Sequence, residues 1–553
     1  MPRTPMFRMA QRTTADYAGA ARTRMPLADY RAARTDHFAQ AADRTPILNR
    51  RSLFRAGAVL AGAALIARAG GPRPAAAAPG DVPRVVIVGA GIAGLNAALT
   101  LADKGIPATV YEASDRVGGR MYSESRYWEG GQVSEYGGEA IDSDHTAILD
   151  LCKRMGLPLV DAAAAAPPGS SDVLYFEGGY VSEEKYATDF RPVFAALQAD
   201  LAAVPQSPTW NDSNPAGVAL SNMTLTEWIA TRVPGGYSNW IARFLDDAYV
   251  VEYGLPTEMQ TALNIVELMG AQETPAQPSV WGASDERYQI EGGNQRLPQA
   301  IAAKLPPGAL QHNYRLEAIT RNSDGTQTLT FDESGTRRTL QADHTILTLP
   351  VGVLKRIDYS AAGFDDRMRG AIEALPMGSC TKLNMQFTAR PWVGRGPWPG
   401  ESTGMSFTDI GYQQIWDATA GQPGTQGIAL QYGGGLGAWR FQPPAPFLTA
   451  DDPSVRAYVD SVMPQFERVV PGVAPLWNGR ATLSAWHLNP FVNGAYSAYP
   501  IGYCHRFAGY EGTRQGNIHL AGEHTSLDSA GYMNGGAESG ARAATEILSD
   551  LGL

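Results

Sequence analysis

Three closely spaced glycines and a later glutamate in residues 85–120 can together hold phosphate and ribose groups. The segment reads VVIVGAGIAGLNAALTLADKGIPATVYEASDRVGGR, and Gly89, Gly91 and Gly94 form a G-x-G-x-x-G motif. Such glycines permit a tight turn, close approach of a pyrophosphate and close packing of a helix on a strand. Glu112 follows 23 residues after Gly89, where a carboxylate can accept both ribose hydroxyls. The sequence therefore predicts a dinucleotide site, with contacts from Gly89, Gly91, Ile92, Ala93, Gly94, Glu112 and Ala113.

A second residue that can do chemistry is Lys382, in the segment GSCTKLNMQF. Polar and apolar residues alternate over 380–387, which predicts a strand with one polar and one apolar face. A lysine on the polar face of a strand usually points into water. The alternative is that this face lines an active site, where an ammonium group would stabilise developing negative charge.

The elements that must position these residues have an α/β pattern. Residues 85–88 form an apolar run typical of a buried parallel strand, a helix opens at the glycines, and a second strand ends at Glu112. This β-α-β unit favours a Rossmann-type domain. A further strand is expected at 427–432.

The residues that continue the first motif resemble those of the flavin amine oxidase family, which includes the monoamine and polyamine oxidases. Ser114 to Arg120 (SDRVGGR) is similar to the family's extended FAD fingerprint, so the resemblance implies FAD and not NAD. Similar segments recur at 134–142 (SEYGGEAID), 285–305, 314–319, 344–357 and 517–548. The resemblance implies a glutathione-reductase-like FAD domain and further FAD contacts from Gly119, Arg120, Gly137, Gly138, Glu139, Leu316, Trp486, Gly522, Glu523, Tyr532 and Met533.

The same resemblance implies the reaction and its residues. Tyr496 and Tyr532 match the two aromatic residues that face each other before the flavin, and Lys382 matches a lysine that holds a water against flavin N5. An amine would be oxidised to an imine, which water hydrolyses to an aldehyde, and O2 would be reduced to H2O2. Monoamine oxidases have a flavin-linked cysteine where this chain has Ala495, so we expect noncovalent FAD.

Acidic residues give the only indication of the substrate. Glu139 and Asp142, and also Glu252, could hold the distal ammonium of a polyamine if they face the cavity, although solvation explains each acid equally well. The formal net charge of −10 also favours cationic ligands. One alternative is an L-amino acid oxidase of the same fold, which needs an arginine such as Arg243 or Arg287 for the substrate carboxylate. Another is a flavin-binding protein without oxidase activity.

The expected organisation interleaves two domains. Residues 83–160, 285–355 and 478–553 are assigned to the FAD-binding domain, and 161–284 and 356–477 to a mixed α+β substrate-binding domain with a helical insertion. Cys152, Cys380 and Cys504 are too few and too scattered for a disulfide framework or a zinc cluster, and the eight histidines show no metal-binding pattern. We expect no metal, no nucleic-acid partner and no stable membrane anchor.

Residues 1–78 form a basic leader that contains arginine but no lysine. Arg50 and Arg51 precede a short apolar run, and Ala75-x-Ala77 offers a cleavage site, which resembles a bacterial twin-arginine export signal. The alternative is a disordered basic tail. Because the twin-arginine machinery carries folded proteins, the signal predicts a periplasmic or secreted protein that acquires its cofactor before export.

Overall fold

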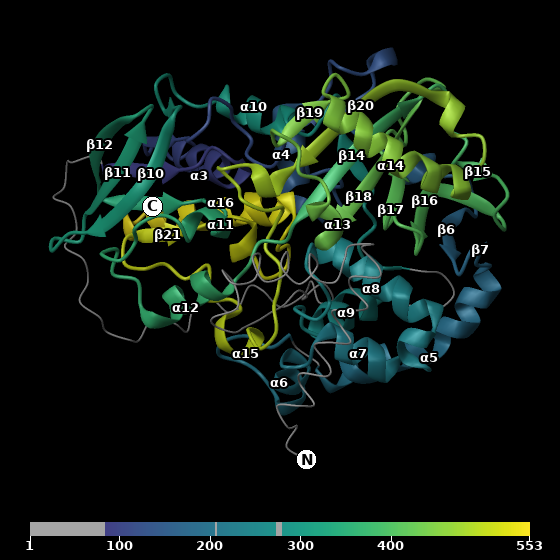
Figure 1. Ribbon diagram of the computed structural model, residues 1–553. Coiled ribbons are helices and arrows are strands. Elements are labelled where there is room, and N and C mark those ends of the chain that lie inside the picture. Colours follow the sequence, from purple (N-terminus) through teal and green to yellow (C-terminus); the bar gives the residue numbers. More distant parts are fainter. Residues whose placement is uncertain (1–82, 205–206, 273–278) are drawn as a thin grey trace.

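The computed structural model describes residues 83–204, 207–272 and 279–553, which form two sheet-based halves and a group of helices (Figure 1). The predicted leader lies outside the described residues. Of the helices that the structure describes, none combines the length and the apolar composition needed to cross a membrane.

A parallel sheet of five strands forms one half, in the order β21-β13-β1-β2-β9. Its strands are β1 (Val85–Val88), β2 (Ala108–Tyr111), β9 (Leu310–Gln311), β13 (His344–Leu347) and β21 (Ile518–Leu520). All four residues of β1 are buried, as expected for a parallel strand covered on both faces. Helix α3 (Ile92–Ala102) packs against the final helix α16 (Met533–Asp550), and α4 (Thr146–Met155) and α10 (Arg296–Ala302) complete this layer. The predicted β-α-β unit is therefore confirmed, with Glu112 directly after β2.

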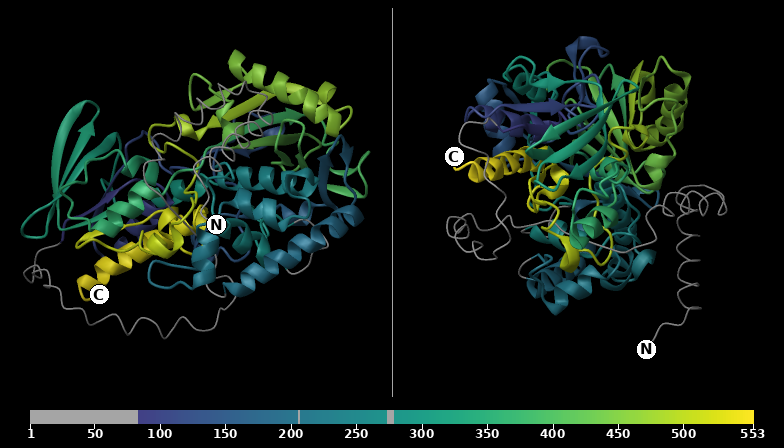
Figure 2. Two further views of the ribbon diagram at one scale, coloured as in Figure 1. Left: turned by 60° about the horizontal axis from the view of Figure 1, so that its bottom comes forward. Right: turned by 90° about the vertical axis from the view of Figure 1, so that its left-hand side faces the viewer.

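A three-stranded antiparallel sheet extends from the end of this half, as Figures 1 and 2 show. It comprises β10 (Tyr314–Arg321), β11 (Gln327–Glu333) and β12 (Thr336–Ala342). Two further pairs of short antiparallel strands are β3 (Ser123–Glu124) with β4 (Ser134–Glu135), and β5 (Leu159–Asp161) with β8 (Tyr288–Ile290).

The other half is a large mixed sheet in the order β19-β20-β14-β18-β17-β16-β6-β7, with β15 paired to β16. Its strands are β6 (Ser171–Phe176), β7 (Gly179–Tyr180), β14 (Cys380–Phe387), β15 (Gly394–Arg395), β16 (Glu401–Thr408), β17 (Gln414–Asp417), β18 (Gly427–Gly434), β19 (Phe447–Thr449) and β20 (Trp477–Ala485). The predicted strand at 380–387 is confirmed. Both of its faces are buried, because β14 lies inside the sheet and its polar residues also point into the protein.

Helices cover the large sheet. One group lies at the bottom of Figure 1: α5 (Glu183–Ala203), α6 (Pro215–Ser221), α7 (Leu225–Arg232), α8 (Trp240–Tyr253) and α9 (Leu263–Leu268). Helices α13 (Leu436–Trp439) and α14 (Pro453–Val469) also contact the large sheet. The remaining helices are α11 (Val351–Leu354), α12 (Asp366–Ala374) and α15 (Cys504–Phe507). Helix α8 packs on β16 and β18, so its C-terminal end reaches the centre of the molecule.

The predicted α/β class is confirmed, but one predicted domain boundary needs correction. Residue 478 was expected to open the last part of the FAD-binding domain, yet it lies within β20, which pairs with β14 and β19 of the large sheet. Strand pairing between distant segments decides this boundary. The remaining domain limits stay predictions.

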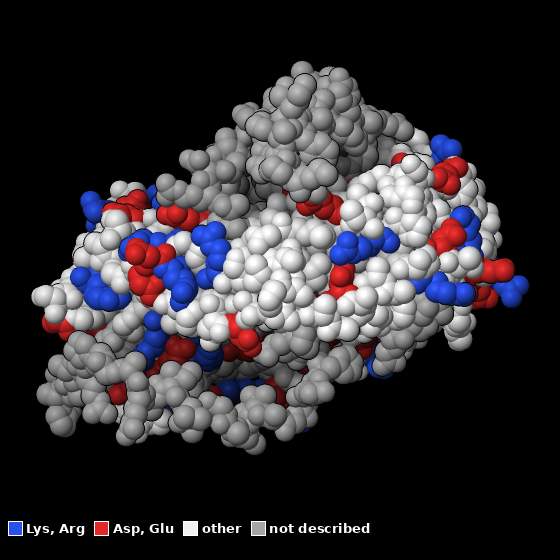
Figure 3. Space-filling view, turned by 90° about the horizontal axis from the view of Figure 1, so that it is seen from below, with Lys and Arg blue, Asp and Glu red and all other residues white. Residues whose placement is uncertain are grey.

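Charged side chains are mixed on the face seen in Figure 3, where Lys and Arg lie close to Asp and Glu with uncharged surface between them. The described residues on this face form no continuous basic surface of the kind that nucleic acid requires.

Candidate active site

A cavity of about 890 Å³ receives residues from both halves of the molecule. Most predicted site residues line it: Gly89, Gly91, Ile92, Ala93, Glu112, Ala113, Gly119, Arg120, Gly137, Gly138, Glu139, Leu316, Lys382, Trp486, Tyr496, Gly522, Glu523, Tyr532 and Met533. Gly94 and Asp142 are the predicted residues that do not line it. Segments more than 400 residues apart in the sequence therefore meet at one site.

The glycine motif shapes one end of the cavity. A Cβ atom at Gly94 would lie 2.0 Å from the carbonyl oxygen of Gly89, so its lack of a side chain lets α3 pack against the turn after β1. A Cβ atom at Gly91 would meet nothing within 4 Å, which leaves the backbone open to the cavity. This open backbone at the start of a helix fits a pyrophosphate.

Glu112 is held at the same end by three hydrogen bonds. Its Oε2 atom accepts one from the Ala90 N–H at 2.8 Å, and its Oε1 atom accepts two from Ser114, from the N–H at 2.9 Å and from the hydroxyl at 2.7 Å. The Oε2 atom retains further acceptor capacity. The arrangement fits the ribose of a dinucleotide.

Glu523 and Arg120 form an ion pair in the middle of the cavity wall. The Arg120 Nη1 atom lies 2.9 Å from the Glu523 Oε1 atom and also donates to the Ala495 carbonyl oxygen. Glu523 further accepts from the Ser497 and Gly531 N–H groups. Burial acts to raise the pKa of Glu523, but the Arg120 charge and the hydrogen bonds outweigh it and lower the pKa to about 2. Glu523 thus stays ionised and ties three cavity-lining segments together.

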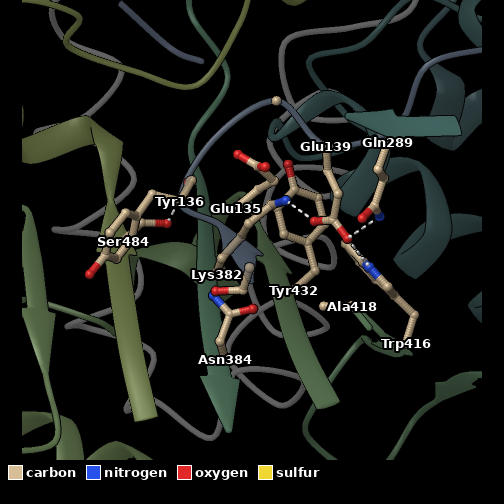
Figure 4. A network of polar contacts seen from close by, with 12 residues as sticks. Glu135, Tyr136, Glu139, Gln289, Lys382, Asn384, Trp416, Ala418, Tyr432 and Ser484 are labelled. Atoms are coloured by element: carbon tan, nitrogen blue, oxygen red, sulfur yellow. Dashed lines mark hydrogen bonds and ion pairs between the residues drawn. The ribbon is translucent and has the colours of Figure 1, made fainter. Parts of the chain in front are cut away.

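Lys382 projects from β14 toward the loop after Gly138, where Glu139 receives it (Figure 4). The Lys382 ammonium pairs with the Glu139 Oε2 atom, and both side chains are 8% exposed. The Glu139 Oε1 atom accepts a hydrogen bond from the Trp416 indole at 2.9 Å. The alternative that Lys382 points into water is wrong, because its side chain is buried and its ammonium pairs with Glu139.

The predicted aromatic residues lie along the same cavity. The Tyr496 hydroxyl donates to the Glu252 carbonyl oxygen at 2.6 Å and lies 3.2 Å from the Tyr432 hydroxyl. Tyr532 is the residue before α16, and its ring centroid lies 4.9 Å from that of His145. The Trp486 indole donates to the Tyr136 carbonyl oxygen at 2.7 Å. That Tyr496 and Tyr532 face each other stays a prediction.

The prediction that Asp142 faces the cavity is wrong. Asp142 is buried behind the wall, where its Oδ1 atom accepts from the Glu286 N–H at 3.1 Å and its Oδ2 atom lies 3.5 Å from the His145 Nε2 atom. Burial raises the pKa of Asp142, and the nearby His145 opposes that rise. Asp142 therefore supports the backbone of Glu286, which does line the cavity.

Acidic residues that sequence reasoning missed line the cavity together with Glu252. Among them are Asp172 on β6 and Glu286 in the loop before β8. Burial raises the pKa of Glu286 well above its usual range, and the charges of Glu252, Asp142, Glu139 and Asp172 raise it further. No local motif marks these acids, because an acid in a loop or at a strand end is usually solvated.

Neither arginine considered for a substrate carboxylate lines the cavity. Arg243 pairs with Glu177 at 2.6 Å, and Arg287 pairs with Asp161 at 2.7 Å. The arginines that do line it are Arg116, Arg120 and Arg315, which come from segments at or near its dinucleotide end.

The expectation that histidines would not cluster also needs correction. His344, His519 and Asp550 offer ligand atoms within 4.8 Å of one another, because β13 and β21 are neighbours and α16 ends beside them. The His519 Nδ1 atom lies 2.7 Å from Glu546, and Asp550 pairs with Arg514. Hydrogen bonds and ion pairs account for this cluster.

Comparison with known proteins agrees with this geometry. The profile of the family described as "Flavin containing amine oxidoreductase" matches residues 92–548. The L-amino-acid oxidase of Mus musculus is 27% identical over 496 residues, which cover 85% of this chain and 71% of that protein. Among solved structures, cyclohexylamine oxidase from Brevibacterium oxydans IH-35A has a TM-score of 0.71 at 21% identity, covering 86% of this chain and all of that one. Wild-type putrescine oxidase bound to putrescine has a TM-score of 0.67 at 20% identity, covering 84% and 99%.

Proposed function

The chain belongs to the flavin-containing amine oxidoreductase family, and we propose that it is an oxidase for amines that carry a second positive charge. FAD is its cofactor. The observation that carries the substrate proposal is the set of carboxylates Asp172, Glu252 and Glu286 around one part of the cavity lining. Burial raises the pKa of Glu286 and Asp172, but a distal ammonium group bound beside them favours their ionised forms and then gains charge-assisted hydrogen bonds from them.

The residues of the site supply binding and orientation. Gly91 and the start of α3 would hold the pyrophosphate, and Glu112 would hold the ribose. Bound FAD would supply the redox chemistry, the two-electron oxidation of the amine and the reduction of O2. Overall, a primary amine, water and O2 give an aldehyde, ammonia and H2O2. Tyr496 and Tyr532 would guide the neutral amine nitrogen and exclude water.

A panel of monoamines, diamines, polyamines and L-amino acids tests the proposal by peroxide release. We expect diamines or polyamines to have the highest kcat/KM. Glu286→Gln should raise the KM for diamines by about 10-fold or more, since a hydrogen bond to a charged group contributes about 1.5–3 kcal/mol. Monoamines with uncharged tails should change little.

The matched control is Glu184→Gln, an exposed acid in the first turn of α5. It should leave both substrate classes unchanged. An equal loss for every amine in Glu286→Gln would contradict a role in charge recognition. Flavin reduction by amines without peroxide release would exclude the oxidase assignment.

L-amino acid oxidation is a second candidate, favoured by the similarity to the mouse enzyme. It requires a cation for the substrate carboxylate. Lys382 is the only lysine in the described cavity lining, and it is already paired with Glu139. Preferred oxidation of neutral L-amino acids in the same panel would establish this candidate in place of the first.

We also propose that FAD is bound noncovalently. Ala495 lines the cavity where a covalent relative would have cysteine, and Cys152 and Cys504 do not line it. Acid precipitation should therefore release essentially all of the flavin absorbance into the supernatant. Flavin that stays with the precipitated chain would contradict this, and peptide mapping for a flavin adduct, with Cys380 as the first residue to check, would then locate the link.

Export by the twin-arginine route is proposed from Arg50 and Arg51 alone, since both lie outside the described residues. The proposal is supported by the cofactor, because a protein that folds around FAD in the cytoplasm needs a route for folded chains.

A further inference from the structure

Glu139 lies on a different element from Lys382, yet its carboxylate receives the Lys382 ammonium (Figure 4). We propose that Glu139 is a positioning residue that fixes Lys382 in the cavity and acts on the reaction only through it. The inference rests on the proposed oxidase function and on the resemblance of Lys382 to the family lysine that holds a water against flavin N5.

The contacts of Glu139 come from three separate elements. Lys382 reaches its Oε2 atom from β14, and Trp416 donates to its Oε1 atom from β17 at 2.9 Å. Gln289 on β8 lies 3.4 Å from the same Oε1 atom. A carboxylate that Trp416 and Gln289 hold independently of the lysine defines one position for the ammonium, whereas a lysine side chain alone has four rotatable carbon–carbon bonds.

Because Lys382 is buried, its ammonium group needs a partner of opposite charge. An ammonium group that is 8% exposed loses most of its hydration, and this loss must be offset by an opposite charge or by strong hydrogen bonds. The rings of Trp416 and Tyr432 lie 5.5 and 5.9 Å from the Lys382 Nζ atom, within the range of a cation–π interaction. They add attraction but do not replace a charge.

A second acid near Lys382, Glu135, already has other hydrogen-bond partners. Glu135 accepts hydrogen bonds from the Ser123 hydroxyl and the Asn294 N–H, at 2.7 and 2.8 Å. Among the described residues, Glu139 is the acid that forms an ion pair with Lys382. Glu139 therefore serves the lysine, and the recognition of a distal substrate ammonium is left to Asp172, Glu252 and Glu286.

A double-mutant cycle with Lys382→Met and Glu139→Gln tests the proposal. In the FAD-loaded enzyme, Lys382→Met should slow reoxidation by O2 by roughly 10²-fold. Glu139→Gln should slow it by about 10-fold in the native background and have no further effect when Lys382 is already methionine. Glu139→Asp, which keeps the charge, should recover part of the loss. Additive effects would overturn the proposal, because an acid with an independent role acts in both backgrounds.

A second readout does not depend on activity. The chain has six lysines, so selective 13C labelling of the lysine ε-carbon gives few resonances, and Lys382→Met identifies the one that matters. An immobilised ε-methylene group has two distinct proton shifts, which merge when the side chain rotates freely. We expect distinct shifts in the native protein and merged shifts in Glu139→Gln; unchanged shifts would overturn the proposal.

Trp416→Phe provides a variant that keeps both charges if Glu139→Gln does not fold. It removes the indole donor to Glu139, so reoxidation should slow about 3-fold, again only when Lys382 is present. An enzyme that oxidises no amine would reject the proposed function, while the lysine resonances would still decide whether Glu139 holds Lys382.

Discussion

Glu135 shows how burial alone changes the chemistry of a single residue. It is almost fully buried on β4, and its two oxygens contact Ser123 and Asn294. Burial is the largest cause that raises its pKa to about 8, and the charge of Lys382 only partly opposes the rise. Glu135 is therefore largely protonated at neutral pH, while the neighbouring pair of Lys382 and Glu139 carries opposite charges.

This pKa predicts a dependence of stability on pH. The unfolded chain ionises Glu135 near pH 4.3, whereas the folded protein keeps the proton until about pH 8. Between these values the folded state binds more protons, so the stability contribution is full below about pH 4 and is lost as pH rises to 8. Glutamine has no proton to lose at this position. The unfolding free energy of Glu135→Gln, relative to that of the native protein, should therefore rise by a few kcal/mol between pH 5 and pH 8.

Thermal unfolding of both proteins at several pH values measures the difference. The exposed Glu184→Gln variant is the control for the loss of one surface carboxylate. A constant difference for Glu135→Gln as well would mean that Glu135 is ionised in the folded protein.

At the scale of elements, two glycines at the junction of β1 and α3 have different roles: Gly94 allows the helix to pack on the turn, and Gly91 leaves room for the cofactor. Gly94→Ala places a methyl group 2.0 Å from the Gly89 carbonyl oxygen, so the helix must shift. We expect a loss of about 1–3 kcal/mol in the unfolding free energy, as for other overpacked sites, together with poor FAD loading. Apoprotein thermal unfolding and the ratio of flavin to protein absorbance measure both effects.

Gly91→Ala is the matched substitution at the same junction. Its methyl group meets nothing within 4 Å and the backbone φ is −73°, which alanine adopts readily. Apoprotein stability should change by less than about 0.5 kcal/mol. FAD affinity should fall about 10-fold or more, since the methyl group projects where the pyrophosphate must approach. Unchanged FAD affinity would contradict the placement of the phosphates at Gly91.

At the scale of the whole molecule, the cavity exists only when the two halves are joined. Its walls include the loops after β1 and β2, strand β14 of the large sheet and the turn before α16. Such a site requires distant segments of the chain to have folded together. This agrees with the proposed export of a folded, FAD-loaded protein.

Replacing Arg50 and Arg51 by lysine tests that proposal in cells. Active, flavin-containing protein should accumulate in the cytoplasm, because the folded chain would have lost its export signal. Cell fractionation followed by the peroxide assay measures the distribution. A disordered basic tail predicts the same distribution between cytoplasm and exterior with and without the substitution, so an unaltered distribution would support that alternative.

The sequence by itself determined the local elements of this protein. The glycine motif and the apolar run before it specify a strand, a tight turn and a helix through backbone geometry alone, and the alternation over 380–387 specifies β14. It also indicated Lys382 as a residue of the site, but only through resemblance to a family. The alternation itself is equally compatible with a lysine that points into water.

Only the tertiary structure decided which side chains meet. Glu139 and Lys382 are 243 residues apart in the sequence, yet they share a buried ion pair. Asp142, only three residues after Glu139, points behind the wall, whereas Glu286 lines the cavity together with Asp172. An acidic residue has the same local signature in solvent, in an ion pair or in a cavity. Its environment depends on long-range packing, which is why the partner of Lys382 and the acidic lining were beyond sequence reasoning.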